Sequence, residues 1–185
     1  VSAGCLAKSG HQVIGAGTQQ VKVAHINAGQ SPILEDGISE LIAEVVREGK
    51  LRATRSAAEA VAQSDLSIVC VGTPSAPNGK PDLAHLASVS HDIGTALASK
   101  KSPHTVVVRS TVLPGTVEEQ VIPIIEGASR RRVGDGYRVL YNREFLREGT
   151  AIADFFAPPL TIVGTMAGES AEALRDLYRA IYAPV

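Results

Sequence analysis

The stretch TVVVRSTVLPGT, residues 105–116, constrains the fold of this chain more than any other stretch. Its β-branched run at residues 106–108 is apolar on both faces, which is typical of a strand buried in a parallel sheet. The sequence turns polar at residues 109–111, and apolar side chains at helical spacing follow over residues 117–125. Strand, polar turn and helix predict half of a βαβ unit, and ligands of such sheets bind beyond the carboxyl ends of the strands.

Two interpretations of the hydroxyls in that polar turn are open at this point. Ser110 and Thr111 would lie at the ligand-binding edge of a parallel sheet. They are equally suited to cap the helix that follows, because Ser and Thr are favoured at helix N-termini. The stretch alone does not favour one interpretation over the other.

The rest of the chain alternates short strands with helices. A second buried strand is predicted at residues 66–71, LSIVCV, and the clearest amphipathic helix has apolar side chains at positions 38, 41, 42, 45 and 46. We predict further strands at residues 11–16, 51–54, 138–141 and 160–163. This alternation indicates an α/β fold built on a doubly wound parallel sheet.

Composition excludes several classes of protein. The hydrophobic fraction of 44% excludes a disordered chain, and the net charge of −1 gives no general attraction to nucleic acid or an anionic membrane. No apolar run is long enough for a transmembrane helix, so we expect neither nucleic-acid nor membrane partners. The two isolated cysteines fit a reducing cytoplasm. We expect Cys5, in a close-packed helix, and Cys70, in a buried strand, to be core residues.

Metal and anion sites are not indicated. None of the five histidines is paired with a cysteine or carboxylate at the spacing of a metal site, so we expect no bound metal. The basic run at residues 130–132 is more typical of a solvated surface than of an anion-binding loop.

Polar residues follow three of the predicted strands, at residues 72–75, 110–111 and 142–148. Because the carboxyl ends of parallel strands lie along one edge of a sheet, we expect these segments to converge, and a dinucleotide suits such a site. Glu144 and Glu148 are four residues apart and share a face only if the segment is helical. Acid–base catalysis and a solvated surface are both open interpretations of this pair.

Five sequence blocks in fixed order carry a resemblance to a known family. They are AGCLAKSGHQVIG (residues 3–15), INAGQSPI (26–33), VCVGTPS (69–75), HTVVVRSTVLPGTV (104–117) and NREFLREGTAIADF (142–155). With these blocks the chain resembles the NAD-binding domain of the UDP-glucose/GDP-mannose dehydrogenase family, and its GDP-mannose members most. The resemblance implies a Rossmann-like fold and NAD as cofactor. It also implies oxidation of the C6 alcohol of a nucleotide sugar to a carboxylate, and a homodimer in the full-length family.

The resemblance also implies residue roles, position by position. Thr111 and Glu144 match catalytic residues that order water and substrate and perform acid–base chemistry. The positions that match cofactor-binding residues are Lys22, Val71, Gly72, Thr73, Pro74, Ser75, Ser110, Thr111, Val112 and Glu148. The positions that match the segment gripping the sugar nucleotide are Glu144, Phe145, Leu146, Arg147 and Glu148.

The chain departs from the family pattern at several places. Gly17 stands where the family has an acidic ribose ligand, Arg143 replaces the proline of N-P-E-F, and Asp36 replaces the proline of E-P-G. The family's first strand and G-x-G-x-x-G turn are not among residues 1–185. We therefore expect a Rossmann-like sheet that lacks its first strand and glycine-rich turn, with a gap or a shifted strand between the strands at residues 11–16 and 66–71.

Residues 1–185 are therefore expected to form an incomplete amino-terminal dinucleotide-binding domain, without the family's central helix and carboxy-terminal domain. The family's catalytic cysteine aligns with neither cysteine here, so we expect the chain to be inactive alone. Two alternatives are open: a non-catalytic remnant that binds a nucleotide sugar weakly or not at all, and a UDP-glucose 6-dehydrogenase.

Overall fold

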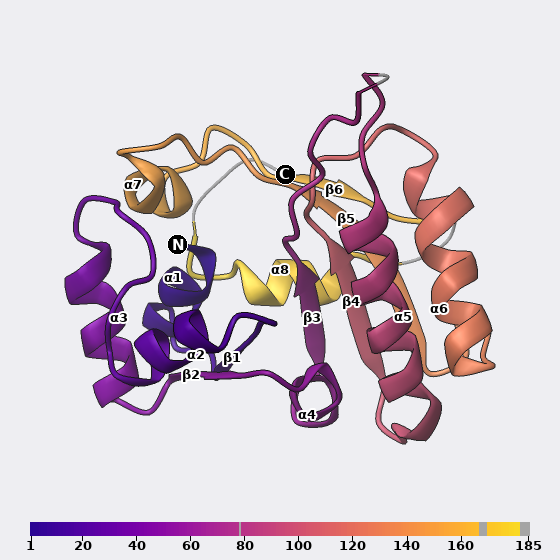
Figure 1. Cartoon of the computed structure of the whole chain (residues 1–185), viewed down its shortest axis with the longest axis horizontal. Coiled ribbons are helices and arrows are strands. Elements are labelled where there is room, and N and C mark those ends of the chain that lie inside the picture. The colour runs from indigo at the N-terminus through magenta and orange to yellow at the C-terminus, as the bar shows by residue number, and fades with distance from the viewer. Residues whose placement is uncertain (78, 167–169, 182–185) are drawn as a thin grey trace. The chain divides into compact units, whose positions relative to one another are not determined.

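The computed structural model describes residues 1–77, 79–166 and 170–181 (Figure 1). The chain divides into two compact units. The first unit is Val1–Ser56, Glu144–Thr161 and Leu174–Val185, and the second unit is Ala57–Arg143 and Ile162–Ala173. Each unit has its own sheet.

The second unit contains a four-stranded sheet in the order β3-β4-β5-β6. Its strands are β3 (Leu66–Val69), β4 (His104–Val108), β5 (Tyr137–Arg143) and β6 (Ile162–Gly164). β4 is parallel to both neighbours, pairing Thr105 with Leu66 and with Arg138. It is buried at four of its five residues, as its run of apolar side chains predicts.

The last strand corrects the prediction of a wholly parallel sheet. β6 is antiparallel to β5, with Tyr141 opposite Gly164. A parallel partner needs a crossover packed on the same sheet, usually a helix. Here the chain between β5 and β6 belongs to the first unit, so the returning strand runs the other way.

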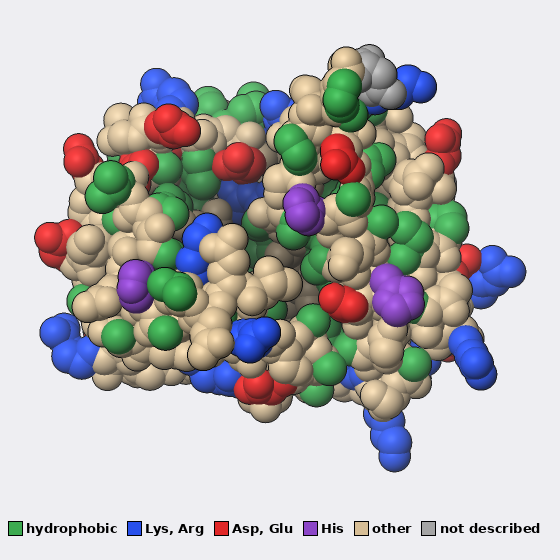
Figure 2. Space-filling view, in the orientation of Figure 1, with side chains coloured by type: hydrophobic (Ala, Val, Ile, Leu, Met, Phe, Trp, Pro, Cys, Tyr) green, Lys and Arg blue, Asp and Glu red, His purple; other side chains and the backbone are tan. Residues whose placement is uncertain are grey.

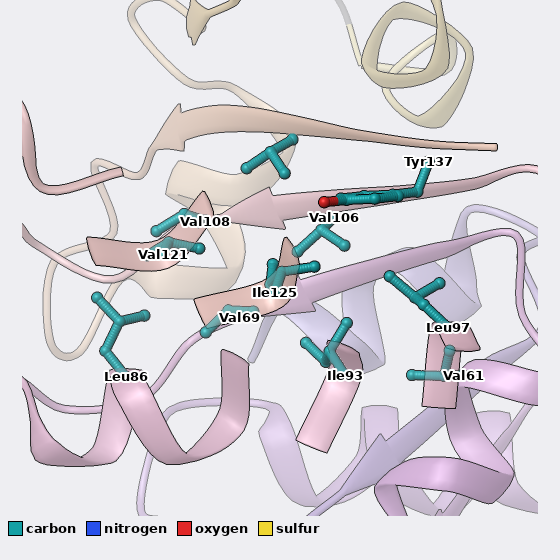
Figure 3. Packing of buried hydrophobic residues seen from close by; sticks show 11 residues of the cluster. Val61, Val69, Leu86, Ile93, Leu97, Val106, Val108, Val121, Ile125 and Tyr137 are labelled. Carbon is teal, nitrogen blue, oxygen red and sulfur yellow. The ribbon is translucent and has the colours of Figure 1, made fainter. Parts of the chain in front are cut away.

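Helices cover the sheet of the second unit and enclose its core. They are α4 (Ala57–Ala62), α5 (Ala84–Ser99), the π-helical turn η1 (Val117–Val121) and α6 (Ile122–Ser129). Figure 3 shows side chains from α5, such as Leu86 and Ile93, gathered with Val106 and Val108 of β4. α5 and α6 lie side by side and approach closely at Gly94.

The helix predicted after β4 begins as a π turn. Pro123 stands at the start of α6, directly after η1. Proline has no backbone N–H to donate and crowds the preceding turn, so the regular ladder is interrupted where the wider turn occurs.

The first unit pairs two short parallel strands, β1 (Val13–Ala16) and β2 (Leu51–Thr54), in a sheet of their own. Its helices are α1 (Ser2–Lys8), α2 (Gln20–Asn27), α3 (Ile38–Arg47), α7 (Ala151–Phe156) and most of α8 (Glu172–Leu177). α3 is the amphipathic helix expected from its apolar spacing, and it buries Leu41, Ile42 and Val45. α1 packs against it through Gly4, where a Cβ would lie 3.1 Å from the Ile42 Cδ1 atom.

β1 and β3 are hydrogen-bonded in separate sheets. The expectation that a further strand, outside residues 1–185, belongs between them in the family stays a prediction.

The two cysteines differ. Cys5 is buried in α1, as predicted. Cys70 is exposed, so the prediction of a core cysteine there is wrong. The ladder of β3 with β4 ends at Val69 opposite Val108, and the backbone N–H of Arg109 then donates to the Val69 oxygen. The apolar run continues past Val69, but the strand does not.

No helix in the described part of the chain is long and apolar enough to cross a membrane. On the face shown in Figure 2, basic and acidic side chains are interspersed.

Candidate active site

Two side-chain hydroxyls join the carboxyl ends of β3 and β4. The Ser110 Oγ donates to the Val71 carbonyl oxygen at 2.7 Å, and the Thr73 Oγ1 donates to the Thr111 carbonyl oxygen at 2.7 Å. Ser110 is buried and Thr111 is exposed. The two segments that follow these parallel strands are thus brought together, as predicted.

These bonds also bear on the interpretation of Ser110 as a helix cap. The next helical element begins at Val117, and its N-cap residue Thr116 makes no side-chain capping bond. The Ser110 hydroxyl is used between strands, so the interpretation of Ser110 as a helix cap is wrong.

The loop after β3 presents backbone and small side chains at this edge. Gly72, Pro74 and Ser75 are exposed, and the space where a Cβ of Gly72 would lie is open. The loop is closed by a bridge between Ser75 and Pro81 and by the Asp82 N–H, which donates to the Pro74 oxygen at 2.7 Å. An edge of this kind admits a flat, polar ligand close to the backbone.

The segment after β5 is irregular. The buried Asn142 side chain ties the end of β5 to β6, because its Nδ2 donates to the Ile162 oxygen at 3.0 Å. No helix is present until α7 begins at Ala151, so Glu144 and Glu148 do not share a helical face. Glu144 is half-buried, and its Oε2 accepts a hydrogen bond from the Leu146 N–H at 3.3 Å.

Arg147 is held by Asp154 of α7. The Arg147 Nη2 donates to Oδ1 at 2.7 Å, its Nε donates to Oδ2 at 3.1 Å, and its backbone N–H donates to Oδ2 at 2.9 Å. Thr150 adds a hydroxyl bond to the same Oδ2. Hydrogen bonds from the Arg147 side chain, and then from its backbone, hold the pKa of the Asp154 carboxyl well below its usual range.

Glu35 binds the same segment from a distant part of the sequence. Its Oε2 accepts from the Gly149 N–H at 2.9 Å, and its Oε1 accepts from the Ala151 N–H at 2.8 Å. Each oxygen of one carboxylate therefore holds one backbone amide at the start of α7.

The first unit also carries the two positions expected near an adenosine ribose. Lys22 is exposed on α2. Gly17 follows β1 directly, is exposed, and its N–H donates to the Thr54 oxygen at 3.1 Å. A Cβ at Gly17 would meet open space, so the fold leaves room for the side chain that glycine lacks.

The family model of the UDP-glucose/GDP-mannose dehydrogenase family, NAD binding domain, matches residues 1–182. The chain belongs to this family.

Comparisons with individual proteins point to the same family. The chain is 47% identical over its full 185 residues to the GDP-mannose 6-dehydrogenase of Pseudomonas syringae pv. syringae, and it spans 42% of that protein's length. It is 38% identical to a UDP-glucose 6-dehydrogenase of Haloferax volcanii over 95% of the chain and 40% of the relative. Its fold is similar to the structure of a GDP-mannose dehydrogenase from Pseudomonas aeruginosa, with a TM-score of 0.96, 45% identity, and coverage of 99% of this chain and 42% of that one.

The residues expected from the UDP-glucose/GDP-mannose dehydrogenase family fall into two sets. Residues 71–75 and 110–112 lie together at the strand ends of the second unit. Lys22 and residues 144–148 belong to the first unit. The matched domain is the family's NAD-binding domain.

Two carboxylates that shape this site carry no local sequence signal for a role in it. Asp154 lies seven residues after Arg147, a distance that indicates contact only if the intervening turn is known. Glu35 is 114 residues from Gly149. Asp154 lies within the block at residues 142–155 and Glu35 directly before Asp36, but neither position predicts these contacts.

The remaining titratable candidates have structural partners. His104 of β4 is buried between the Ser67 Oγ at 2.8 Å and the Ser64 oxygen at 3.1 Å. Of the basic run, Arg131 donates to the Lys100 and Ala98 oxygens near the end of α5. Among the described residues, no group of three or more His, Cys, Asp or Glu side chains is placed to hold a metal ion.

Proposed function

We propose that this chain is the NAD-binding part of a nucleotide-sugar 6-dehydrogenase, which oxidises the C6 alcohol of GDP-mannose to a carboxylate. The observation that carries the proposal is the match of the family's NAD-binding domain over residues 1–182. The 47% identity to a GDP-mannose 6-dehydrogenase supports GDP-mannose over UDP-glucose. The finer choice of sugar is part of the proposal.

The cofactor residues are those that match the family at the strand ends. Each NAD, when bound, would accept one hydride from the sugar carbon, so two NAD in turn, together with one water, would take the alcohol through the aldehyde level to the carboxylate. Residues 71–75 and 110–112 hold the cofactor through backbone groups, and the hydroxyl bonds of Ser110 and Thr73 keep the two segments at a fixed spacing. Lys22, exposed on α2, supplies a positive charge for the adenosine side, and Glu148 contributes near the nicotinamide.

The catalytic residues are Thr111 and Glu144. The Thr111 carbonyl is fixed by Thr73, while the residue is exposed and able to position water and the sugar C6 hydroxyl. Glu144 accepts the proton that this hydroxyl loses on oxidation. Its Oε2 is oriented by the Leu146 N–H. The substrate is gripped by residues 144–148.

The proposal extends to the setting of the protein. The partners are a nucleotide-sugar substrate and, as in the full-length family, a second copy in a homodimer. The location is the cytoplasm, which suits the two isolated cysteines. Neither nucleic acid nor a membrane is a partner.

Isothermal titration of residues 1–185 with NAD, GDP-mannose and UDP-glucose tests the proposal. We expect NAD to bind and GDP-mannose to bind more tightly than UDP-glucose. We expect Thr111→Ala to weaken NAD binding and Glu144→Gln to weaken GDP-mannose binding. The control is Glu118→Gln, at an exposed position of η1, which leaves both affinities unchanged. A folded chain that binds none of the three ligands would overturn the proposal.

A second candidate function is a non-catalytic remnant, which would bind none of the three ligands. The glycine at position 17 favours this candidate. A carboxylate at this position would bind the ribose hydroxyls through charge-assisted hydrogen bonds worth about 1.5–3 kcal/mol. The variant Gly17→Asp separates the two candidates. A gain in NAD affinity of tenfold or more means that the rest of the cofactor site is intact, whereas no gain supports the remnant.

A further inference from the structure

The carboxylate of Glu35 fixes backbone in the segment proposed to grip the sugar nucleotide. Its two oxygens accept hydrogen bonds from the Gly149 and Ala151 N–H groups at 2.9 and 2.8 Å. Glu35 is half-buried and lies just before α3, in the same unit as this segment. Hydrogen bonds to a charged acceptor are about twice as strong as neutral ones, so this contact defines where α7 begins.

Asp154 provides a second hold within the segment itself. It accepts from the backbone N–H and side chain of Arg147 and from the Thr150 hydroxyl. With Glu35, the N–H groups of three alternate residues, 147, 149 and 151, are directed at carboxylates. The turn passes through Gly149 at a φ of 83°, a conformation that glycine adopts without strain.

The two holds are not equivalent. Asp154 is seven residues from Arg147, so that contact closes a local turn. It does not depend on the position of the turn relative to the rest of the unit. Glu35 ties the segment to a different part of the fold, the loop just before α3. Its loss would remove these two bonds to the backbone, while the bonds between Asp154 and Arg147 would stay.

We propose that Glu35 is a positioning residue for nucleotide-sugar binding. It fixes residues 149–151, and through them the placement of the directly preceding residues 144–148. This inference rests on the proposed function, in which residues 144–148 contact the substrate. Glu35 does not touch the reacting atoms in this role.

The variant Glu35→Gln isolates the feature that the inference requires. The carboxamide has nearly the same size, but it offers one oxygen acceptor and turns an NH₂ donor toward the second N–H. One of the two backbone amides therefore loses its partner. Glu35→Asp keeps the charge and both acceptor oxygens on a shorter side chain. We expect it to retain part of the hold on the two backbone amides that Glu35→Gln loses. The matched control is Glu40→Gln, an exposed glutamate five positions further along the chain on α3.

Two measurements on residues 1–185 test the inference. In Glu35→Gln we expect hydrogen exchange at the Gly149 and Ala151 amides to speed up at least tenfold, with exchange at Val107 of β4 unchanged. We expect the Kd for GDP-mannose to rise about tenfold and the Kd for NAD, which depends on Glu148 alone within residues 144–148, to rise by no more than about threefold. A merely structural residue would move both affinities together or neither, and Glu40→Gln is expected to move nothing.

Each other outcome counts against the inference. Unchanged amide exchange in Glu35→Gln, or faster exchange with an unchanged Kd for GDP-mannose, overturns it. If Glu35→Gln does not fold, Glu35→Asp takes its place under the same criteria. A wild-type chain that binds no nucleotide sugar overturns the proposed function and the substrate role of Glu35 with it. In that case the exchange data still report whether the carboxylate holds the turn, so the two failures are distinguishable.

Discussion

The sheets of the two units differ in how deeply their strands are buried. In the second unit, β4 is buried at four of its five residues and meets apolar side chains of α5 and α6. In the first unit, β1 has no buried residue, and its strand carries a half-buried Val13 and Ile14. The difference teaches that the second unit centres its buried apolar side chains on its sheet, whereas the first unit buries many of its own on helices such as α1 and α3.

Side-chain hydrogen bonds to backbone supplement the buried apolar side chains of the first unit. The Asn27 amide at the end of α2 both donates to the Ala53 oxygen at 2.9 Å and accepts from the Ala53 N–H at 2.7 Å. Near the start of α7, the carboxylates of Glu35 and Asp154 accept hydrogen bonds from backbone N–H groups. Such bonds fix direction well but each contributes only about 1–3 kcal/mol net. A fully buried residue of the second unit is therefore expected to be more sensitive to loss of apolar volume than a residue of the half-buried β1.

The largest expected effect follows from one substitution made in both units. Ile125→Ala removes a fully buried side chain of α6, and we expect it to cost about 3–4 kcal/mol of unfolding free energy through lost burial and a residual cavity. Ile14→Ala removes the same atoms from the half-buried β1, and we expect about 1 kcal/mol. Urea denaturation followed by circular dichroism measures both values. Equal costs at the two sites would show that the contrast between the units is wrong.

The second prediction uses pH to act on the second unit. Burial, and then the nearby Lys100 charge, lower the pKa of His104 from 6.5 to about 4. Between these pH values the unfolded state binds more protons than the folded state. The unfolding free energy therefore falls as the pH drops from 6.5 to 4 and stops falling below 4 on this account. The loss is about 3 kcal/mol in total.

The variant His104→Gln separates this effect from the titration of carboxylates elsewhere. Glutamine retains a donor and an acceptor for Ser67 and Ser64 but does not titrate. We expect the variant to lose less stability than the wild type between pH 7 and pH 4, measured by urea denaturation at each pH. Parallel losses in the two proteins would mean that His104 is not the acid-sensitive group.

Sequence patterns predicted best the elements whose own side chains are buried. β4 and α3 were both predicted, because a β-branched run and a helical apolar period each determine which face is buried. The joined ends of β3 and β4 followed from the parallel arrangement. These predictions need only local sequence and the rules of parallel sheets.

Features set by partners elsewhere in the fold were not predicted. The antiparallel direction of β6 depends on the route of the chain through the other unit, and the exposure of Cys70 depends on where the partner strand ends. The two amides held by Glu35 lie 114 and 116 residues away from it. No periodicity or spacing in the sequence reports contacts of this kind, so the sequence names candidate residues of the site but not the side chains that hold them in place.

The smallest expected effect concerns the close approach of α5 and α6, and it tests whether the core of the second unit is as tightly packed as its burial implies. A Cβ at Gly94 would lie 2.8 Å from the Ala128 Cβ and 2.9 Å from the Ile125 carbonyl oxygen. A backbone oxygen cannot move aside by changing rotamer, so Gly94→Ala must push the helices apart, at a cost of about 1–3 kcal/mol. Gly127→Ala, in α6, meets open space and is expected to be neutral or to stabilise by up to about 1 kcal/mol through helix propensity. Thermal unfolding measures the change in melting temperature of each variant. A decrease for Gly94→Ala together with no change or an increase for Gly127→Ala would establish that α5 and α6 are in contact at Gly94. A stabilising Gly94→Ala would mean that the two helices lie further apart than the packing of the second unit requires.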